Sequence, residues 1–178
     1  MKSPVIIFIL LVFSSFLSAQ DKNKPLQTVK SVDLKRYAGL WYEIAKIPNR
    51  FQKSCTGNTT AEYLLRDDGR INVKNSCANA DGKREVTEGV AKVVENSNNT
   101  KLEVSFFSVL GIRPFWGDYW VIGLDDNYQY AVVGDPDRKY GWILSRTKVL
   151  SEKNLKEALS ILKQKGYDVN RFEYTKQE

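Results

Sequence analysis

The sequence predicts an all-β domain that is followed by a single helix. Short runs of alternating apolar and polar residues are separated by turn residues, and Asp67-Asp68-Gly69 has the composition of a tight hairpin turn. Short connections between the runs favour antiparallel neighbours. Eight such strands are expected, and periodicity alone leaves open whether they form a closed barrel or two stacked sheets.

The strands follow one another along most of the chain. On the second, Ala61, Tyr63 and Leu65 share one face and polar residues occupy the other. Segments rich in Asn, Asp and Pro separate later strands at 96–100, 125–127 and 135–137. The expected strand ranges are 39–48, 59–66, 71–76, 85–95, 101–108, 118–125, 128–134 and 140–147.

One helix is expected after the strands. Ser151 is a favourable N-cap, and Gly166 follows the last turn. An apolar stripe with helical spacing should pack on the outside of the β-structure; it consists of Leu155, Ala158, Leu159 and Leu162. Residues 171–175 are a candidate ninth strand.

The composition excludes several classes of chemistry. The 178 residues include no His and two Cys. Catalysis by Ser-His-Asp or Cys-His, His-ligated haem and the usual zinc sites are therefore excluded, and no metal or cofactor is expected. The net charge of +6 comes from scattered basic residues without a basic helix, so nucleic acid is not an expected partner.

The N-terminus resembles a secretory signal. Lys2 precedes an apolar run, and small residues end at Ala19. We therefore expect a signal peptide over 1–19 and a domain over 20–178. A buried N-terminal helix is disfavoured because polar residues begin at Gln20. Gln20 also stands where a lipoprotein box requires Cys, so no lipid anchor is predicted. The expected location is periplasmic, outer-membrane-associated or secreted. In such an oxidising compartment, Cys55 and Cys77 most simply form one disulfide.

Three motifs resemble those of the lipocalin family. They are the GxW segment Gly39-Leu40-Trp41, the pair of segments 119–124 (YWVIGL) and 130–135 (YAVVGD), and the segment 142–146 (WILSR). The similarity is particularly to bacterial outer-membrane lipocalins and the apolipoprotein D group. It implies an eight-stranded antiparallel up-and-down β-barrel with the C-terminal helix packed outside. Gly39, Trp41 and Arg146 are then structural, with Arg146 across the Trp41 ring and residues 32–37 plugging the closed end.

Strand alternation from an inward Trp41 predicts the barrel lining. For the sixth strand we favour the face of Tyr119, Val121 and Gly123, because Gly123 would leave room for a ligand. The alternative reading is that inward aromatics fill the barrel and that Glu43 pairs with a basic neighbour. The expected ligand-binding residues are Glu43, Ala45, Ile47, Ala61, Tyr63, Val73, Asn75, Val104, Phe106, Tyr119, Val121, Trp142 and Leu144.

The expected mouth loops are basic. Residues 48–58, 78–84, 109–117 and 135–140 hold seven basic and three acidic side chains, which favours anionic amphiphiles or peripheral contact with an anionic membrane. The apolar segment 109–116 either contacts a membrane, serves as a lid or folds back into the mouth.

The expected function is non-catalytic binding, storage or transport of a fatty acid, lysophospholipid or similar lipid, for example in envelope lipid maintenance. The alternatives are a lipid-modifying enzyme using Cys55, Cys77, Glu43 or Tyr63, and a protein-binding barrel that acts through its mouth loops. The sequence leaves the choice between monomer and dimer open.

Overall fold

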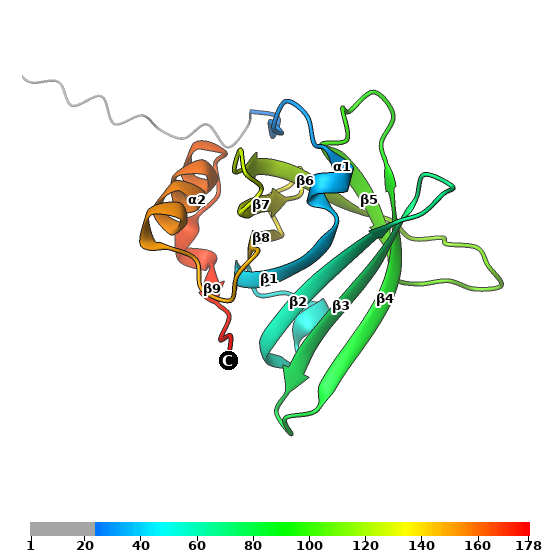
Figure 1. Cartoon of the computed structure of the whole chain (residues 1–178), viewed down its shortest axis with the longest axis horizontal. Coiled ribbons are helices and arrows are strands. Elements are labelled where there is room, and N and C mark those ends of the chain that lie inside the picture. The colour runs from blue at the N-terminus through cyan, green and yellow to red at the C-terminus, as the bar shows by residue number, and fades with distance from the viewer. Residues whose placement is uncertain (1–23) are drawn as a thin grey trace, which may run out of the picture.

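The computed structural model describes residues 24–178, which form one closed antiparallel barrel with a helix outside it (Figure 1). The strands run in the order β2-β3-β4-β5-β6-β7-β8-β1-β9, and β1 also pairs with β2, which closes the barrel. The predicted eight-stranded barrel is confirmed, and the expected signal peptide lies outside the described residues. The strands are β1 (Gly39–Lys46), β2 (Cys55–Leu65), β3 (Ile71–Asn79), β4 (Arg84–Val93), β5 (Lys101–Ser105), β6 (Gly117–Leu124), β7 (Tyr130–Gly134), β8 (Gly141–Ser145) and β9 (Glu173–Tyr174).

A short helix, α1 (Leu34–Tyr37), covers one end of the barrel. The Asp33 carboxylate caps it by accepting hydrogen bonds from the backbone N–H groups of Lys35 and Arg36. Val32, Leu34 and Tyr37 then pack into the interior cluster that also contains Trp41. The predicted plug at the closed end is therefore present.

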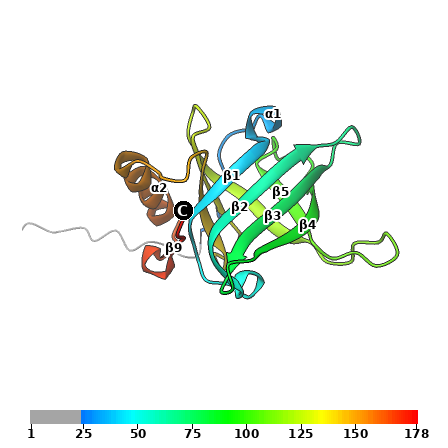
Figure 2. The ribbon, with the colours of Figure 1, turned by 60° about the horizontal axis from the view of Figure 1, so that its bottom comes forward.

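Helix α2 (Glu152–Gln164) lies against the outside of the barrel, as Figures 1 and 2 show. Ser151 caps its first turn, and Gly166 follows it with a left-handed φ of 82°. The buried side chains Ala158 and Leu162 join a second apolar cluster with outward-facing strand residues such as Ile122 and Ile143. The barrel is thus packed on both sides of its β6–β8 wall. Two short 3₁₀ helices complete the fold, η1 (Arg50–Gln52) and η2 (Val169–Arg171).

A bulge in β1 changes which residues face the interior. Glu43 pairs with Leu144, but the next pair is Ala45 with Ile143, so two residues of β1 oppose one of β8. Ala45 and Ile47 therefore lie in the outer cluster under α2. Their expected inward orientation is wrong, because alternation beyond the bulge is shifted by one residue.

A second bulge lies between β6 and β7, and because of it the predicted inward orientation of Gly123 is wrong. The β6–β7 register shifts between Val121 and Gly123. A Cβ on Gly123 would lie 2.9 Å from Cγ2 of Ile161, so Gly123 faces α2 rather than the barrel interior. Tyr119 and Val121 do belong to the inner cluster, as predicted.

The C-terminal segment 173–178 fills a gap in the barrel wall. Pairing between β1 and β2 ends at Tyr42 and Thr60. Beyond that point, the Gln177 side chain donates to the carbonyl oxygens of Glu43 and Thr59, at 2.8 Å each. Asn58 N–H donates to the Lys176 carbonyl at 2.7 Å. This segment therefore bridges the two diverging strands.

Candidate ligand-binding chamber

The floor of the barrel is sealed by Trp41 and Arg146. Trp41 is fully buried, and the guanidinium carbon of Arg146 lies 3.8 Å from its ring centroid. The same guanidinium donates to the carbonyl oxygens of Leu40 at 2.8 Å and Arg36 at 2.6 Å. Cation–π attraction and charged hydrogen bonds therefore both fix the floor.

Three buried tyrosines lie above this floor. The hydroxyl oxygens of Tyr37 and Tyr119 are 2.7 Å apart, and Tyr63 donates to Tyr119 over 2.9 Å. Burial raises the pKa of Tyr63 to about 12 and raises the pKa of Tyr37 and Tyr119 well above the usual value. The three hydroxyls are thus neutral and bonded mainly to one another.

The lower half of the barrel is filled by these side chains. A cavity of about 10 Å³ lies between α1 and the inner faces of β2–β6, bordered by Tyr63, Ile71, Leu102 and Tyr119. That volume holds at most about one water molecule. The alternative reading, that inward aromatics fill the barrel, therefore holds at this depth, where Val121 and Leu144 are buried as well.

The upper half is open on the side of β3–β5. Asn75 pairs with Thr87, and both face inward because Asn75 alternates with buried Val73. Thr87 is exposed, and Phe106 at the rim is 43% exposed. Asn75 Oδ1 is buried without a hydrogen-bond partner. Solvent thus reaches inward-facing positions above the tyrosines.

A polar cluster occupies the opposite side of the upper barrel. The buried Glu43 carboxylate accepts hydrogen bonds from Lys46 at 3.2 Å, Gln52 at 2.6 Å and Thr175 at 2.5 Å. Gln52 also accepts from the Trp142 indole N–H at 3.2 Å. The Lys46 side chain is only 14% exposed, so a buried ion pair is present here. Glu43 is therefore paired with a basic neighbour, which was the alternative reading of its role.

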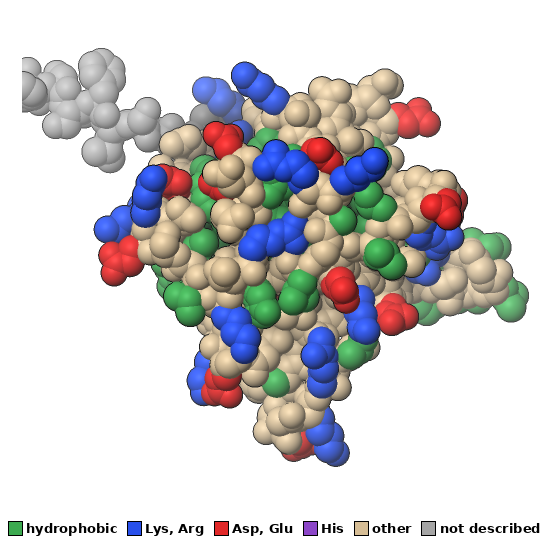
Figure 3. All heavy atoms as spheres, in the orientation of Figure 1, with side chains coloured by type: hydrophobic (Ala, Val, Ile, Leu, Met, Phe, Trp, Pro, Cys, Tyr) green, Lys and Arg blue, Asp and Glu red, His purple; other side chains and the backbone are tan. Residues whose placement is uncertain are grey.

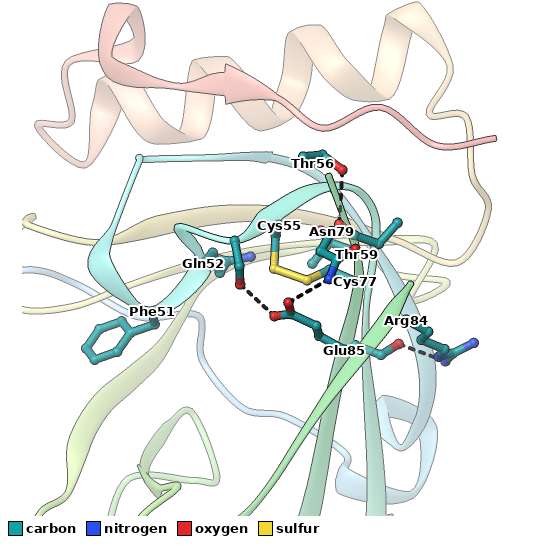
Figure 4. The surroundings of a disulfide bond; sticks show 12 residues. Phe51, Gln52, Cys55, Thr56, Thr59, Cys77, Asn79, Arg84 and Glu85 are labelled. Atoms are coloured by element: carbon teal, nitrogen blue, oxygen red, sulfur yellow. Dashed lines mark hydrogen bonds between the residues drawn. A yellow bond between two sulfur atoms is a disulfide. The ribbon is translucent and has the colours of Figure 1, made fainter. Parts of the chain in front are cut away.

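The disulfide joins β2 to β3 near the mouth, with its Cα atoms 5.5 Å apart, so the predicted pairing of Cys55 with Cys77 is confirmed. Figure 4 shows the Glu85 carboxylate turned toward it, held by Asn79 at 3.1 Å and Ser54 at 2.6 Å. These hydrogen bonds lower the pKa of Glu85. The bridge and the carboxylate together tie the η1 loop to the strand ends.

An apolar ribbon projects from the barrel between β5 and β6; we define it as residues 106–116. Val109 and Ile112 bond to each other through two backbone hydrogen bonds of 2.9 Å, around a turn in which Leu110 and Gly111 have positive φ. Leu110 is 97% exposed and Phe115 is 70% exposed. Figure 3 shows hydrophobic side chains gathered on this projection at the right of the view. The segment does not fold back into the mouth.

The structure places most predicted lining residues on the inner face. Tyr63, Val73, Val121 and Leu144 lie in the buried part of the inner cluster, and Ala61, Val104, Tyr119 and Trp142 pack against it. Sequence reasoning missed Lys46, Gln52 and Thr175. The β1 bulge turns Lys46 inward, and loop and C-terminal residues carry no strand periodicity, so no signal in the sequence pointed to them.

Within residues 24–178, no group of three or more acidic or Cys side chains is placed to hold a metal ion. In the same part of the chain, no helix has the length and apolarity needed to cross a membrane.

The closed eight-stranded barrel has a sealed floor, an open rim and one outer helix. This architecture places the protein in the class of small cup-shaped β-barrels. The family model described as a lipocalin-like domain matches residues 32–177. The chain belongs to the lipocalin family.

Relatives and a solved structure agree with this assignment. Outer membrane lipoprotein Blc of Escherichia coli (strain K12) is 43% identical over 161 residues, covering 90% of this chain and 88% of that protein. Temperature-induced lipocalin-1 of Arabidopsis thaliana is 41% identical over 159 residues, covering 88% and 85%. Insecticyanin from the tobacco hornworm Manduca sexta superposes with a TM-score of 0.71 at 26% identity, covering 87% of this chain and 86% of that one.

Proposed function

We propose that the protein binds a small hydrophobic or amphiphilic molecule, such as a fatty acid or lysophospholipid, in the upper half of the barrel. The observation that carries the proposal is the set of inward positions left open above the tyrosines, including Thr87 and Phe106. Transfer of an alkyl chain from water to this surface is favourable by about 0.8 kcal/mol per buried CH₂. Membership of the lipocalin family supports the proposal.

The proposed contact residues lie at the rim and on the inner face below it. Phe106 offers exposed apolar surface at the rim, Ala61, Val73 and Val104 lie in the inner cluster, and Trp142 lies beside the polar cluster. Asn75 would orient the ligand, because its buried Oδ1 lacks a donor that a ligand hydroxyl or amine supplies.

Fluorescence titration with cis-parinaric acid tests the proposal. Native protein should bind the probe with micromolar or tighter affinity. Thr87→Arg, which places a charge at an exposed inward position of the open space, should abolish binding, whereas Glu62→Arg on the outer face of β2 should leave it unchanged. Absence of probe binding to folded native protein would refute the proposal.

The structure weakens the enzymatic alternative. Both cysteines of the chain are in the disulfide, so no thiol nucleophile is offered. The hydroxyl of Tyr63 is buried, its pKa is raised to about 12, and it bonds to Tyr119. A binding role without chemistry is therefore the proposal.

We also propose that the protein is exported and contacts anionic membranes through the ribbon. The predicted signal peptide, the disulfide and a relative named as an outer membrane lipoprotein support export. The exposed Leu110 and Ile112 suit the apolar layer of a bilayer surface, and Arg113 gives the same ribbon a positive charge, with its guanidinium directed back to the Ser105 carbonyl at 3.0 Å. Arg138 does not add to this surface, because it bonds the Lys165 carbonyl beside α2 at 2.7 Å.

Flotation with phosphatidylglycerol vesicles at low salt tests membrane contact. Native protein should float, and Leu110→Ser/Ile112→Ser should not. Val149→Ser, a matched loss of an exposed apolar side chain elsewhere, should float like the native protein. Failure of the native protein to float would remove the membrane proposal and leave ligand binding untouched.

A further inference from the structure

The barrel wall is incomplete beside the open half of the chamber. The β4–β5 ladder ends at the pair Val90 and Ser105. Beyond it, β4 continues to Arg84, paired with β3 on one side. Within residues 24–178 no strand pairs with the other edge of residues 84–89. The backbone groups along this edge therefore pair with no other strand of the described chain.

The ribbon is a direct continuation of the neighbouring hairpin. Val104 pairs with Gly117, and five residues further along each arm Val109 pairs with Ile112. The pair at the turn is therefore in the β5–β6 register, whereas residues 106–108 and 113–116 between the two pairs form no ladder. The ribbon is a projecting hairpin whose tip alone is paired.

The unpaired edge and the ribbon match in register and length. Continuing the β4–β5 ladder past Val90 and Ser105 sets Gly89 opposite Phe106, Thr87 opposite Ser108 and Glu85 opposite Leu110. The Phe106 side chain already lies against Gly89, since a Cβ on Gly89 would lie 2.6 Å from Cδ1 of Phe106. Residues 106–110 thus fit residues 85–89 without a register shift.

Two side-chain hydrogen bonds hold the outward bend. Arg113 Nη1 donates to the Ser105 carbonyl at 3.0 Å, and Ser105 Oγ donates to the Phe107 carbonyl at 3.1 Å. Both engage backbone acceptors at the point where the ribbon leaves β4. Both join residues within the segment 105–113, and neither involves a residue of the inner cluster.

We propose that the ribbon is the missing wall of the binding chamber, and that residues 106–110 pair with the edge of residues 85–89 when an alkyl chain is bound. By strand alternation, this closure turns Phe106, Ser108 and Leu110 to the inner face, with Phe115 beside Phe106. Leu110, which is exposed to solvent in the described conformation, then becomes a ligand contact. The proposal rests on the proposed function for its ligand, but the closure itself is tested independently of it.

Cross-linking tests the closed register. In Val86→Cys/Val109→Cys the two cysteines are directly opposite in the closed form, and both positions are exposed, so folding should be unaffected. Val86→Cys/Leu110→Cys is the matched control, because a shift of one residue puts its cysteines on opposite faces. The first pair should oxidise roughly tenfold faster than the control, and faster still with cis-parinaric acid bound. Equal rates for the two pairs, or no cross-link in the first, would overturn the proposal.

An affinity measurement tests the ligand contact in solution without vesicles. Leu110→Ser should weaken cis-parinaric acid binding roughly tenfold, although Leu110 lies outside the chamber in the described conformation. The control Val149→Ser should bind like the native protein. Unchanged affinity in Leu110→Ser would refute the ligand contact. If the native protein binds no probe, the proposed function fails, and the cross-linking comparison still decides whether the ribbon closes.

Discussion

The guanidinium of Arg146 lies 3.8 Å above the ring centroid of Trp41, and the Trp41 indole N–H donates to the Tyr37 carbonyl at 2.8 Å. Arg146 also donates to that carbonyl at 3.1 Å. Arg146, which directly follows β8, thus holds β1 and the plug at residues 32–37 together. The floor depends on this contact as well as on apolar packing, because the guanidinium satisfies the carbonyl oxygens of Arg36, Tyr37, Ala38 and Leu40.

Replacement of Arg146 should therefore destabilise the whole barrel. Arg146→Ala is expected to cost about 3 kcal/mol of unfolding free energy, since both the cation–π contact and several charged hydrogen bonds are lost. Arg146→Lys should cost less, because the charge remains but the planar donor set does not. Urea unfolding measures both. Arg70→Ala, an exposed control, should change stability by less than about 0.5 kcal/mol, and an equal effect there would contradict the assignment.

The tyrosine cluster predicts a loss of stability at alkaline pH. Tyrosine ionises near 10.0 in the unfolded chain, whereas the pKa of folded Tyr63 is about 12. The folded state therefore holds protons that the unfolded state releases, so this stability is fully present below pH 10.0 and is lost as the pH rises through 12. Thermal unfolding across this range should show the decline. Tyr119→Phe should make it shallower, and an unchanged slope would argue against the cluster.

Breaking the Glu43–Lys46 pair should be costly unless both charges are removed. Glu43→Gln leaves the Lys46 ammonium buried beside a neutral amide, with an expected cost of about 3 kcal/mol. Glu43→Gln/Lys46→Met should recover most of that loss. Chemical denaturation of both variants, with exposed Glu62→Gln as control, checks this. If the double variant were as unstable as the single one, Glu43 would stabilise the fold through a contact other than the one with Lys46.

Removal of the disulfide should weaken the mouth but leave the floor intact. The bridge spans a sequence separation of 22 residues, so Cys55→Ser/Cys77→Ser should lose about 3 kcal/mol. A reductant should lower the unfolding midpoint of native protein and have no effect on the variant. A native protein that is insensitive to full reduction would contradict this expectation.

Much of the fold could be predicted because its strands alternate regularly. Tyr63 and Val73 were placed correctly inside the barrel, because β2 and β3 pair without irregularity from Thr60 and Ser76 to Leu65 and Ile71. The family resemblance supplied the closure into a barrel and the contact between Trp41 and Arg146.

The chamber was harder to predict because bulges and loops form it. The shift between Glu43 and Ala45 moves Ala45 and Ile47 outside, and a bulge leaves no trace in apolar periodicity. Gln52 and Thr175 enter the chamber from segments that are not part of the alternating strands. The filling of the lower barrel depends on how the tyrosines pack, which composition alone does not specify.

The position of Trp142 has a practical consequence for spectroscopy. Trp41, Trp116 and Trp120 each lie under a cationic side chain, at the floor or on the outer wall. Trp142 is the one indole on the inner face near the rim, where it bonds to Gln52. Direct contact with a guest should therefore change intrinsic emission mainly through Trp142, and Trp142→Phe should remove most of that change.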